Sequence, residues 1–223
     1  MYLNPRFCFK KISECAKMDL LFSNKSKNIP CRIVIIFYCC FLICSASIAS
    51  TTTIPAPLVS VDSFILVDHI TGTVLAEKNA DKKMEPASLS KIMTVYVAAN
   101  ALRDGYMSLS ETTLVSKKAW RMEGSRMFIE VGTNVLVDDL LNGIIVQSGN
   151  DSSVALAEHL YGSEKSFVEQ MNLTAENLQM TNSRFGNVTG LPDKGTYVTA
   201  RDMTKLSRSL IENFPDIYKR FSL

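Results

Sequence analysis

The sequence predicts an α+β fold in which a short β-hairpin precedes a mostly helical body. Its composition is that of a globular protein, because 47% of the 223 residues are apolar and 21% are charged. Residues 65–77 place two apolar runs on either side of a glycine-containing turn, a pattern typical of a hairpin. Apolar residues at helical spacing then recur along the chain without internal repeats. One compact domain is therefore expected for residues 60–223.

Five helices are predicted from this spacing. The last one opens with Thr199 and Asp202, which form a capping-box pattern. Residues 105–135 are expected to be irregular with short strands, and residues 184–196 to form a loop. The predicted helices cover residues 88–103, 137–146, 151–161, 164–179 and 199–214. The residues expected on the apolar sides of the first and last helices are Leu89, Ile92, Met93, Tyr96, Leu102, Met203, Leu206, Leu210 and Phe214.

Residues 1–49 are predicted to be a secretory signal peptide. Basic residues precede twelve consecutive apolar residues at 33–44, and Ser47 and Ala49 supply the small side chains of a cleavage site. Cleavage after Ala49 would leave residues 50–59 as a linker. The protein is therefore expected in the periplasm or at the outer face of the cytoplasmic membrane.

Two alternatives concern this leader. An uncleaved anchor would associate the protein with the membrane, although twelve apolar residues are fewer than the about 20 that a spanning helix needs. Met18 is an alternative start, because the segment before the apolar run is long.

The leader also holds all six cysteines and the excess of basic over acidic residues. Without cysteines, residues 50–223 contain no disulfide framework, cysteine nucleophile or cysteine-ligated metal. Seven of the 24 basic and two of the 22 acidic residues lie in 1–49, so the remainder has a net charge of −3. A nucleic-acid partner is not indicated, because there is no basic excess to neutralise phosphates.

Ser88 and Lys91 are three positions apart at the start of the first predicted helix. Residues at this spacing share one helix face, so the lysine amine is expected to lie close to the serine hydroxyl. A serine hydroxyl becomes a good nucleophile when a base removes its proton. Lysine can be that base if burial or nearby positive charge lowers its pKa. The pair therefore predicts a Ser/Lys acyl-transfer site, although S-x-x-K alone is expected about once by chance in a chain of this size.

A second pattern, Ser148-Gly149-Asn150, lies between two predicted helices. S-x-N is equally common by chance, since Ser26-Lys27-Asn28 in the leader also matches it. The two patterns gain weight together, because both stand at helix boundaries where side chains can point into a cleft.

The wider contexts of these patterns resemble the low-molecular-mass penicillin-binding proteins, which are serine-type D-alanyl-D-alanine carboxypeptidases. The resemblance covers residues 60–220 and rests on the stretches PASLSKIMTVYVA, GSRMFIEVG, LLNGIIVQSGNDSSVALAEHLYGS, FVEQMN and TARDM. It implies a penicillin-binding-protein/β-lactamase-like fold, in which a helical lobe stands beside an antiparallel sheet. It also implies that D-Ala-D-Ala stem peptides of peptidoglycan are the substrate and that β-lactam antibiotics are acylating inhibitors.

The resemblance assigns a role to each of four residues. It makes Ser88 the nucleophile, Lys91 its proton acceptor and Ser148 a hydroxyl that relays a proton to the leaving D-alanine. It makes Asn150 the amide that binds the substrate peptide and positions Lys91. The backbone N–H of Ser88 would be one oxyanion-hole donor. No metal or organic cofactor is required.

One family element is missing from the sequence. Penicillin-recognising enzymes carry a third motif, K-T-G or a close variant, on a strand after S-x-N, and this sequence contains none. We therefore expect a chain truncated before that strand, with a sheet that lacks its C-terminal strands and with doubtful activity. The alternatives are an inactive peptidoglycan- or penicillin-binding remnant and one half of a split gene.

Two further mechanisms are weighed from single residues. A β-lactamase would need a deacylating glutamate, and Glu169 in the sequence Glu169-x-x-Asn172 is a superficial candidate that falls on the surface of a predicted helix. A Ser-His-Asp triad is disfavoured, because His69 is expected in the hairpin turn and His159 on a helix.

Overall fold

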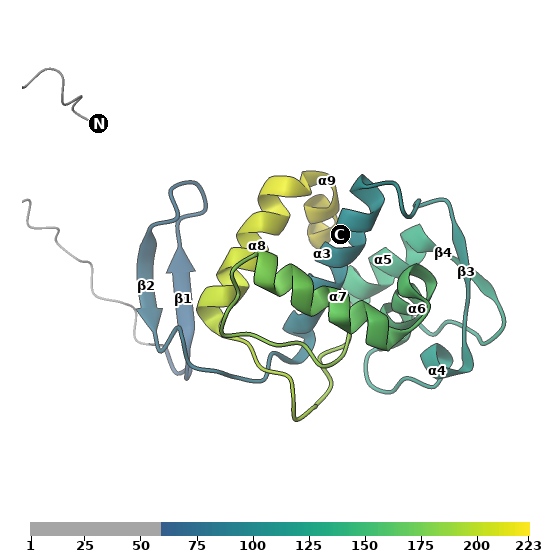
Figure 1. Cartoon of the computed structure of the whole chain (residues 1–223), viewed down its shortest axis with the longest axis horizontal. Coiled ribbons are helices and arrows are strands. Elements are labelled where there is room, and N and C mark those ends of the chain that lie inside the picture. Colours follow the sequence, from purple (N-terminus) through teal and green to yellow (C-terminus); the bar gives the residue numbers. More distant parts are fainter. Residues whose placement is uncertain (1–58) are drawn as a thin grey trace, which may run out of the picture. The chain divides into compact units, whose positions relative to one another are not determined.

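The structure is a computed structural model that describes residues 59–223. The predicted signal peptide and all but the last residue of the predicted linker lie outside the described residues. In chain order the elements are β1 (Phe64–Val67), β2 (Val74–Lys78), the 3-10 turn η1 (Ala87–Leu89), α3 (Ser90–Arg103), β3 (Thr112–Leu114), α4 (Lys117–Trp120), β4 (Asn134–Leu136), α5 (Val137–Gln147), α6 (Asn150–Tyr161), α7 (Glu164–Asn177), α8 (Ala200–Asn213), α9 (Pro215–Tyr218) and η2 (Lys219–Ser222). This order confirms the predicted α+β class (Figure 1).

The predicted hairpin is confirmed as β1 and β2. The strands pair antiparallel from Phe64 opposite Lys78, and the register shifts between Leu66 and Val67. Asp68 organises the turn, because its carboxylate accepts hydrogen bonds from the backbone N–H of Thr71 at 2.7 Å and from its hydroxyl at 2.6 Å. These bonds favour the charged carboxylate and lower the pKa of Asp68.

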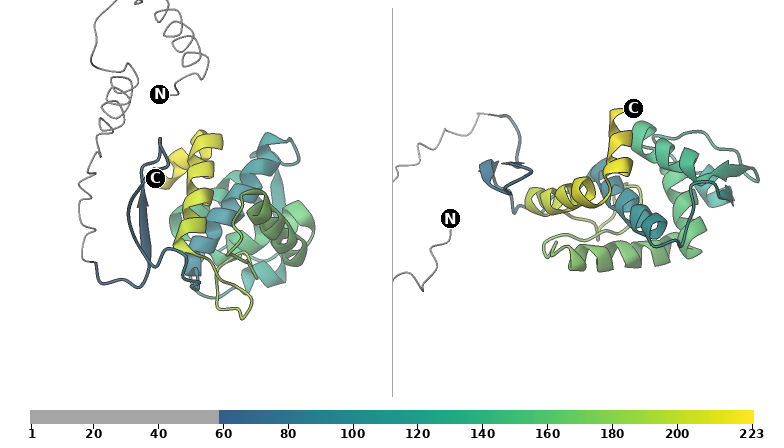
Figure 2. Two further views of the ribbon diagram at one scale, coloured as in Figure 1. Left: turned by 60° about the vertical axis from the view of Figure 1, so that its left-hand side comes forward. Right: turned by 90° about the horizontal axis from the view of Figure 1, so that it is seen from above.

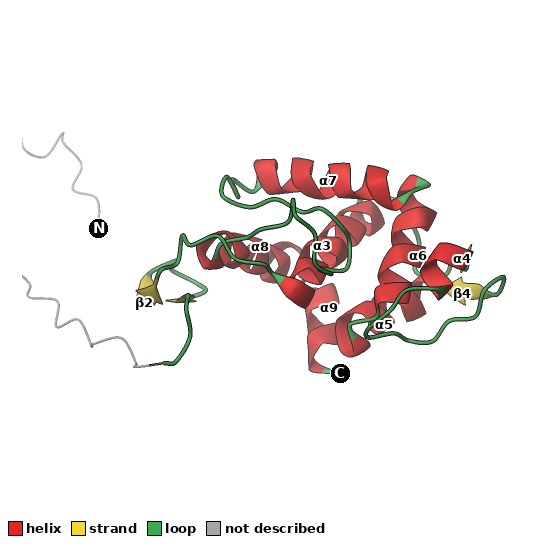
Figure 3. Cartoon of the chain, turned by 90° about the horizontal axis from the view of Figure 1, so that it is seen from below, coloured by secondary structure: helices red, strands yellow, loops and turns green. Residues whose placement is uncertain are grey.

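Helix α3 is the central helix of the body. It contacts α5, α6, α7 and α8, and ten of its fourteen residues are buried. Figures 1 and 3 show it running between α8 on one side and α5 and α6 on the other. Met93 and Tyr96 are buried as predicted, but so are Ala98 and Ala99, whose small side chains admit neighbouring helices closely. The prediction for Leu89 is wrong, because this residue lies in η1 and is 54% exposed.

Residues 105–135 contain a short strand, as predicted, and also the short helix α4. Strand β3 pairs antiparallel with β4, which directly precedes α5. Helix α4 begins where the Ser116 hydroxyl accepts a hydrogen bond from the backbone N–H of Ala119 at 3.0 Å. The two strand pairs stand at opposite ends of the helical body (Figure 2). Within residues 59–223, no helix combines the length and the hydropathy of a membrane span.

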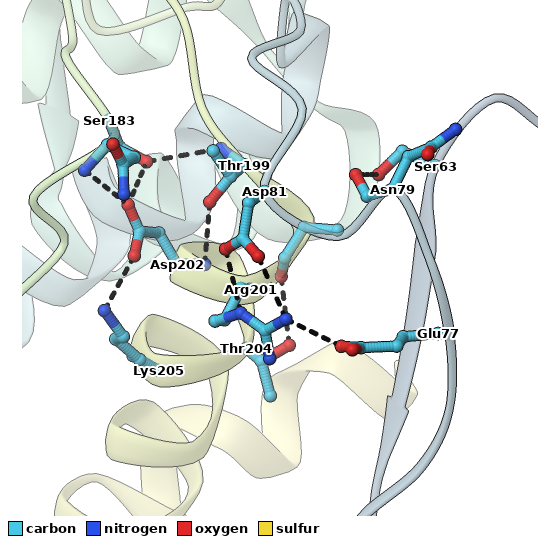
Figure 4. Close-up of polar contacts among 12 residues, drawn as sticks. Ser63, Glu77, Asn79, Asp81, Ser183, Thr199, Arg201, Asp202, Thr204 and Lys205 are labelled. Atoms are coloured by element: carbon cyan, nitrogen blue, oxygen red, sulfur yellow. Dashed lines mark hydrogen bonds and ion pairs between the residues drawn. The ribbon is translucent and has the colours of Figure 1, made fainter.

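The start of α8 ties several loop segments together (Figure 4). One of the two hydrogen bonds of the predicted capping box is present. The Thr199 hydroxyl accepts a hydrogen bond from the backbone N–H of Asp202 at 3.1 Å. The Asp202 carboxylate does not reach back to Thr199. It accepts from the Asn182 N–H and the Ser183 hydroxyl, both at 2.9 Å, and Ser183 in turn accepts from the Thr199 N–H at 3.3 Å. Aspartate is one methylene shorter than the glutamate that usually closes a capping box.

Arg201 on the same helix fastens the hairpin to the body. Its guanidinium donates to Asp81 at 2.8 and 3.0 Å and to Glu77 of β2 at 2.7 Å (Figure 4). A single antiparallel β-bridge joins Met84 to Val198 just before α8. These contacts fix the segment that leads from the hairpin to Ser88. The core side of α8 is as predicted, with Met203, Leu206, Leu210 and Phe214 all buried.

Candidate active site

Ser88 lies in η1, the 3-10 turn that leads directly into α3. The predicted start of the helix at residue 88 is therefore corrected: Ser88 lies in a 3-10 turn, and the α-helix begins at Ser90. The preceding residue, Ala87, has a positive φ of 47°, which is unusual for a residue with a side chain. Pro86 is buried while Ser88 is exposed, so the serine lies at the surface, two residues after a buried position.

Lys91 meets Ser88 as its spacing predicts. The Nζ atom of Lys91 lies 3.4 Å from the Ser88 Oγ and donates a hydrogen bond to the Thr189 carbonyl at 2.7 Å. Lys91 is only 5% exposed, and burial lowers its pKa to about 8, because the ammonium form loses water. With this pKa about one-tenth of the amine is neutral at pH 7, and that form can accept a proton from Ser88.

The Thr189 carbonyl is a site component that the sequence did not indicate. It belongs to the loop of residues 185–190, which the chain reaches almost a hundred residues after Lys91. The same loop receives a hydrogen bond from the Thr94 hydroxyl to the Val188 carbonyl at 2.8 Å. Backbone carbonyls carry no residue-type signal, and only the turn-forming pattern of Asn187 and Gly190 could have drawn attention to the loop.

Ser148 and Asn150 stand at the junction of α5 and α6, as predicted. Ser148 ends α5 in the left-handed conformation with φ 55°, and its buried Oγ has no hydrogen-bond partner within residues 59–223. The Asn150 side chain, 4% exposed, donates from Nδ2 to the Glu123 carbonyl at 2.6 Å. Its backbone N–H donates to the Ser125 carbonyl at 2.7 Å.

The two motifs are not joined directly. Among the described residues, no hydrogen bond links Ser148 or Asn150 to Ser88 or Lys91. The role of Asn150 in positioning Lys91 therefore stays a prediction, while its Nδ2 holds the chain segment at Glu123.

Asp151 was not singled out in the sequence, yet it organises this side of the site. Its carboxylate, on a residue 1% exposed, accepts backbone N–H bonds from Met127 at 3.0 Å, Phe128 at 2.8 Å and Ile129 at 3.3 Å. It sits in the first turn of α6, where the helix dipole favours a negative charge. The loop of residues 123–129 is thereby fixed against the helix that carries Asn150.

The residues of the competing mechanisms lie elsewhere. His159 pairs with Glu111 at 3.1 Å, and no hydrogen bond joins either histidine to Ser88 in the described part of the chain. Glu169 is exposed on α7, as a surface residue of a helix would be. The Asn172 side chain is engaged with the backbone of Phe185, donating at 2.8 Å and accepting at 3.0 Å.

The amine that faces Ser88 belongs to a lysine, an arrangement that fits a Ser/Lys acyl-transfer site. The family model for D-alanyl-D-alanine carboxypeptidases matches residues 50–222. The chain belongs to the D-alanyl-D-alanine carboxypeptidase family, which confirms the resemblance seen in the sequence.

Curated relatives share this family. The D-alanyl-D-alanine carboxypeptidase DacC of Escherichia coli K12 is 44% identical over 184 residues, which are 80% of this chain and 46% of DacC. DacF of Bacillus subtilis 168 is 41% identical over 150 residues, which are 67% of this chain and 39% of DacF. The chain thus spans less than half the length of these two relatives.

Solved structures confirm the predicted penicillin-binding-protein fold. Penicillin-binding protein 5 from Haemophilus influenzae superposes with a TM-score of 0.75 at 36% identity, covering 76% of this chain and 50% of that chain. Penicillin-binding protein D2 from Listeria monocytogenes, solved in its ampicillin-bound form, gives a TM-score of 0.68 at 28% identity and covers 76% of this chain and 68% of that chain.

Proposed function

We propose that this chain carries the acylation machinery of a serine-type D-Ala-D-Ala carboxypeptidase. The substrate would be the peptidoglycan stem peptide, from which the terminal D-alanine is removed. The observation that carries the proposal is the approach of the Lys91 Nζ to within 3.4 Å of the Ser88 Oγ, at a lysine whose pKa burial lowers to about 8. The family and the named relatives supply the reaction class.

In the proposed reaction, the Ser88 Oγ attacks the carbonyl carbon of the penultimate D-alanine and its proton passes to the Lys91 Nζ. The tetrahedral intermediate then expels the terminal D-alanine, whose amine takes up a proton, and leaves an ester on Ser88. Water hydrolyses this ester and restores the hydroxyl. The partnerless Ser148 Oγ is the group proposed to pass the proton to the leaving amine.

Recognition of β-lactam antibiotics follows from the same chemistry. A β-lactam carbonyl would acylate Ser88 as the stem peptide does, and the ampicillin-bound relative supports this part of the proposal. A stem peptide that has lost its terminal D-alanine no longer has the D-Ala-D-Ala bond whose cleavage drives cross-linking. The proposed function therefore includes a contribution to cell-wall maturation and cell shape.

Fluorescent penicillin tests the nucleophile. We expect covalent labelling of a fusion that joins this chain to the K-T-G-bearing half of DacC. Ser88→Ala and Lys91→Ala should abolish labelling, while Ser110→Ala, a change at another exposed serine, should leave it intact. Labelling that persists in Ser88→Ala would refute the assignment.

Turnover by the chain alone is expected to be low. The sequence lacks K-T-G, the family element that binds the substrate carboxylate and supplies the second oxyanion donor. One lost oxyanion donor costs about 10²–10³ in rate, and lost positioning adds to this, so D-alanine release should fall by about 10⁴ or more below a complete relative. A diacetyl-Lys-D-Ala-D-Ala peptide is the test substrate. Release at a relative's rate, dependent on Ser88, would show that the third motif is dispensable or supplied by another chain.

One observation favours a second candidate, a non-catalytic binding remnant: the absence of K-T-G from the sequence. A remnant would bind peptidoglycan fragments yet leave Ser88 unlabelled even in the fusion. A β-lactamase is disfavoured by the exposed position of Glu169, and rapid nitrocefin hydrolysis by the fusion would reverse that judgement.

Export is proposed from the leader sequence alone. The apolar run at 33–44 and the small residues Ser47 and Ala49 support cleavage after Ala49 and a place in the periplasm or at the outer face of the cytoplasmic membrane. Mass spectrometry of the envelope fraction should find chains that begin at Ser50. Chains that begin only at Met1 or Met18 would favour the anchored, membrane-associated form.

A further inference from the structure

The loop of residues 185–190 covers the Lys91 amine and is anchored at several points. Asn172 on α7 brackets its start at Phe185, and Glu164, itself paired with Lys118 at 2.6 Å, accepts a long 3.3 Å bond from the Val188 N–H. Val188 and Thr189 are 0% and 2% exposed. Phe185, Val188 and Thr189 therefore pack into the core, while Asn187 and Gly190 are partly exposed.

The Asn187 side chain holds the end of this loop next to the lysine. Its Oδ1 accepts three hydrogen bonds, from the Thr189 N–H at 3.1 Å, the Thr189 hydroxyl at 3.0 Å and the Gly190 N–H at 2.7 Å. Its Nδ2 donates to the Leu191 carbonyl at 2.9 Å. An asparagine that bonds the backbone two and three residues on is a stable local turn. Every polar atom of the Asn187 amide is thus used to shape the peptide that carries the Thr189 carbonyl.

That carbonyl decides how Lys91 faces Ser88. A neutral amine has two N–H bonds and one lone pair. When one N–H donates to the Thr189 carbonyl at 2.7 Å, this bond fixes the rotation of the amine about its Cε–Nζ bond. The lone pair can then point at the Ser88 hydroxyl 3.4 Å away. Without the carbonyl the amine would rotate freely, and water would replace the acceptor.

We propose that Asn187 is a positioning residue for the acylation step, because it fixes the Thr189 carbonyl that orients the Lys91 amine towards Ser88. This inference rests on the proposed Ser88 chemistry. Asn187 itself touches neither Ser88 nor the reacting carbonyl, and it acts through the loop backbone.

The same loop shields the Lys91 side chain from water. Burial is the cause that lowers the pKa of Lys91, and no acidic side chain in residues 59–223 forms an ion pair with it. Removal of the Asn187 amide leaves the N–H groups of the buried Thr189 and the partly buried Gly190 without their acceptor, so the loop should open to water. The pKa of Lys91 should then rise from about 8 towards 10.5. Each unit of that rise removes about nine-tenths of the neutral amine at pH 7.

The first test follows acylation by fluorescent penicillin between pH 6 and 10 in the fusion of the full chain to the K-T-G-bearing half of DacC. Asn187→Ala should lower the rate at pH 7 by about tenfold or more and move the midpoint of the pH profile upward. Asn187→Asp, which keeps the acceptor oxygen, should recover most of the high-pH rate. Asn177→Ala, at an exposed asparagine in the last turn of α7, is the matched control and should behave as wild type.

A wild-type midpoint and rate in Asn187→Ala would overturn the inference. A loss that is equal at every pH, with an unchanged midpoint, would also overturn it, because it would show that Asn187 serves only the fold.

The second test does not depend on Ser88 reactivity. The pKa of Lys91 is measured directly from the ¹³Cε resonance of labelled lysine, assigned through its absence in Lys91→Arg. A higher pKa in Asn187→Ala than in wild type supports the inference even in a chain that penicillin does not label, a result that would count against the proposed function alone. An equal pKa in both proteins refutes the inference.

Discussion

Gly190 lies against the nucleophile turn and offers a sharp test of the site geometry. A Cβ atom at Gly190 would lie 1.7 Å from the Ala87 carbonyl oxygen and 2.4 Å from its carbon, far inside van der Waals contact. The atoms it meets are backbone, which cannot rotate away. Ala87 directly precedes Ser88 and already has a positive φ. Gly190→Ala must therefore displace either the loop or the nucleophile.

The cost has two parts. Gly190 has φ +79°, and placing a residue with a Cβ in that region costs about 1–2 kcal/mol. Overpacking of a rigid site costs about 1–3 kcal/mol more. The free energy of unfolding should therefore fall by about 2–5 kcal/mol, which lowers Tm by about 4–20 °C in a domain of this size. A displacement of Ser88 by about 1 Å should also slow acylation about 100-fold.

Gly105 is the matched control, because it has nearly the same φ of +75° and nothing within 4 Å of the added Cβ. Thermal unfolding of Gly105→Ala and Gly190→Ala isolates the contact, since both pay the same backbone cost. Penicillin labelling of the folded proteins then reports the displacement of Ser88. Equal Tm values for the two variants, or wild-type labelling by Gly190→Ala, would refute the close approach.

Three other outcomes are expected. Acylation should accelerate as pH rises through about 8, because the neutral Lys91 amine is the base and deprotonation supplies it; a flat rate from pH 7 to 9 would contradict this. Asp151→Ala should lower the free energy of unfolding by about 3 kcal/mol in urea titrations, since three loop N–H groups lose a buried charged acceptor, and a loss under about 1 kcal/mol would count against it. Arg201→Ala, which breaks the ion pairs to Glu77 and Asp81, should speed hydrogen exchange in the β1/β2 hairpin but not in α3. An equal change of exchange rate in the hairpin and in α3 would show that these ion pairs do not hold the hairpin to the body.

Local patterns predicted most of the elements. The helices α3 and α5 to α8 follow from apolar spacing, and the hairpin follows from two apolar runs about a turn. The Ser88–Lys91 approach was predictable for the same reason, since both residues belong to one continuous turn of chain. The error at Leu89 arose because the sequence does not distinguish a 3-10 turn from the first turn of an α-helix.

The unpredicted parts depend on contacts between distant segments. The hydrogen bond from Lys91 to the Thr189 carbonyl joins residues 98 positions apart, and any residue type could supply that carbonyl. The Asp151 carboxylate was overlooked because a first-turn aspartate is common at the surface, where it would only favour the helix dipole. Its three loop partners are backbone N–H groups, which leave no pattern in the sequence.

The surroundings of Lys91 indicate that proton acceptance by the lysine and binding of the substrate carboxylate depend on different parts of the fold. The groups that bury the amine and bind it, namely α3, η1 and the loop of residues 185–190, all lie within the described residues. The family resemblance assigns K-T-G to carboxylate binding and to the second oxyanion donor, and the proposed proton transfer from Ser88 to Lys91 uses neither group. The tuning of the base should therefore be intact in this chain even where turnover is lost. Measurements of the Lys91 pKa report on the first half of the site, and D-alanine release reports on the second.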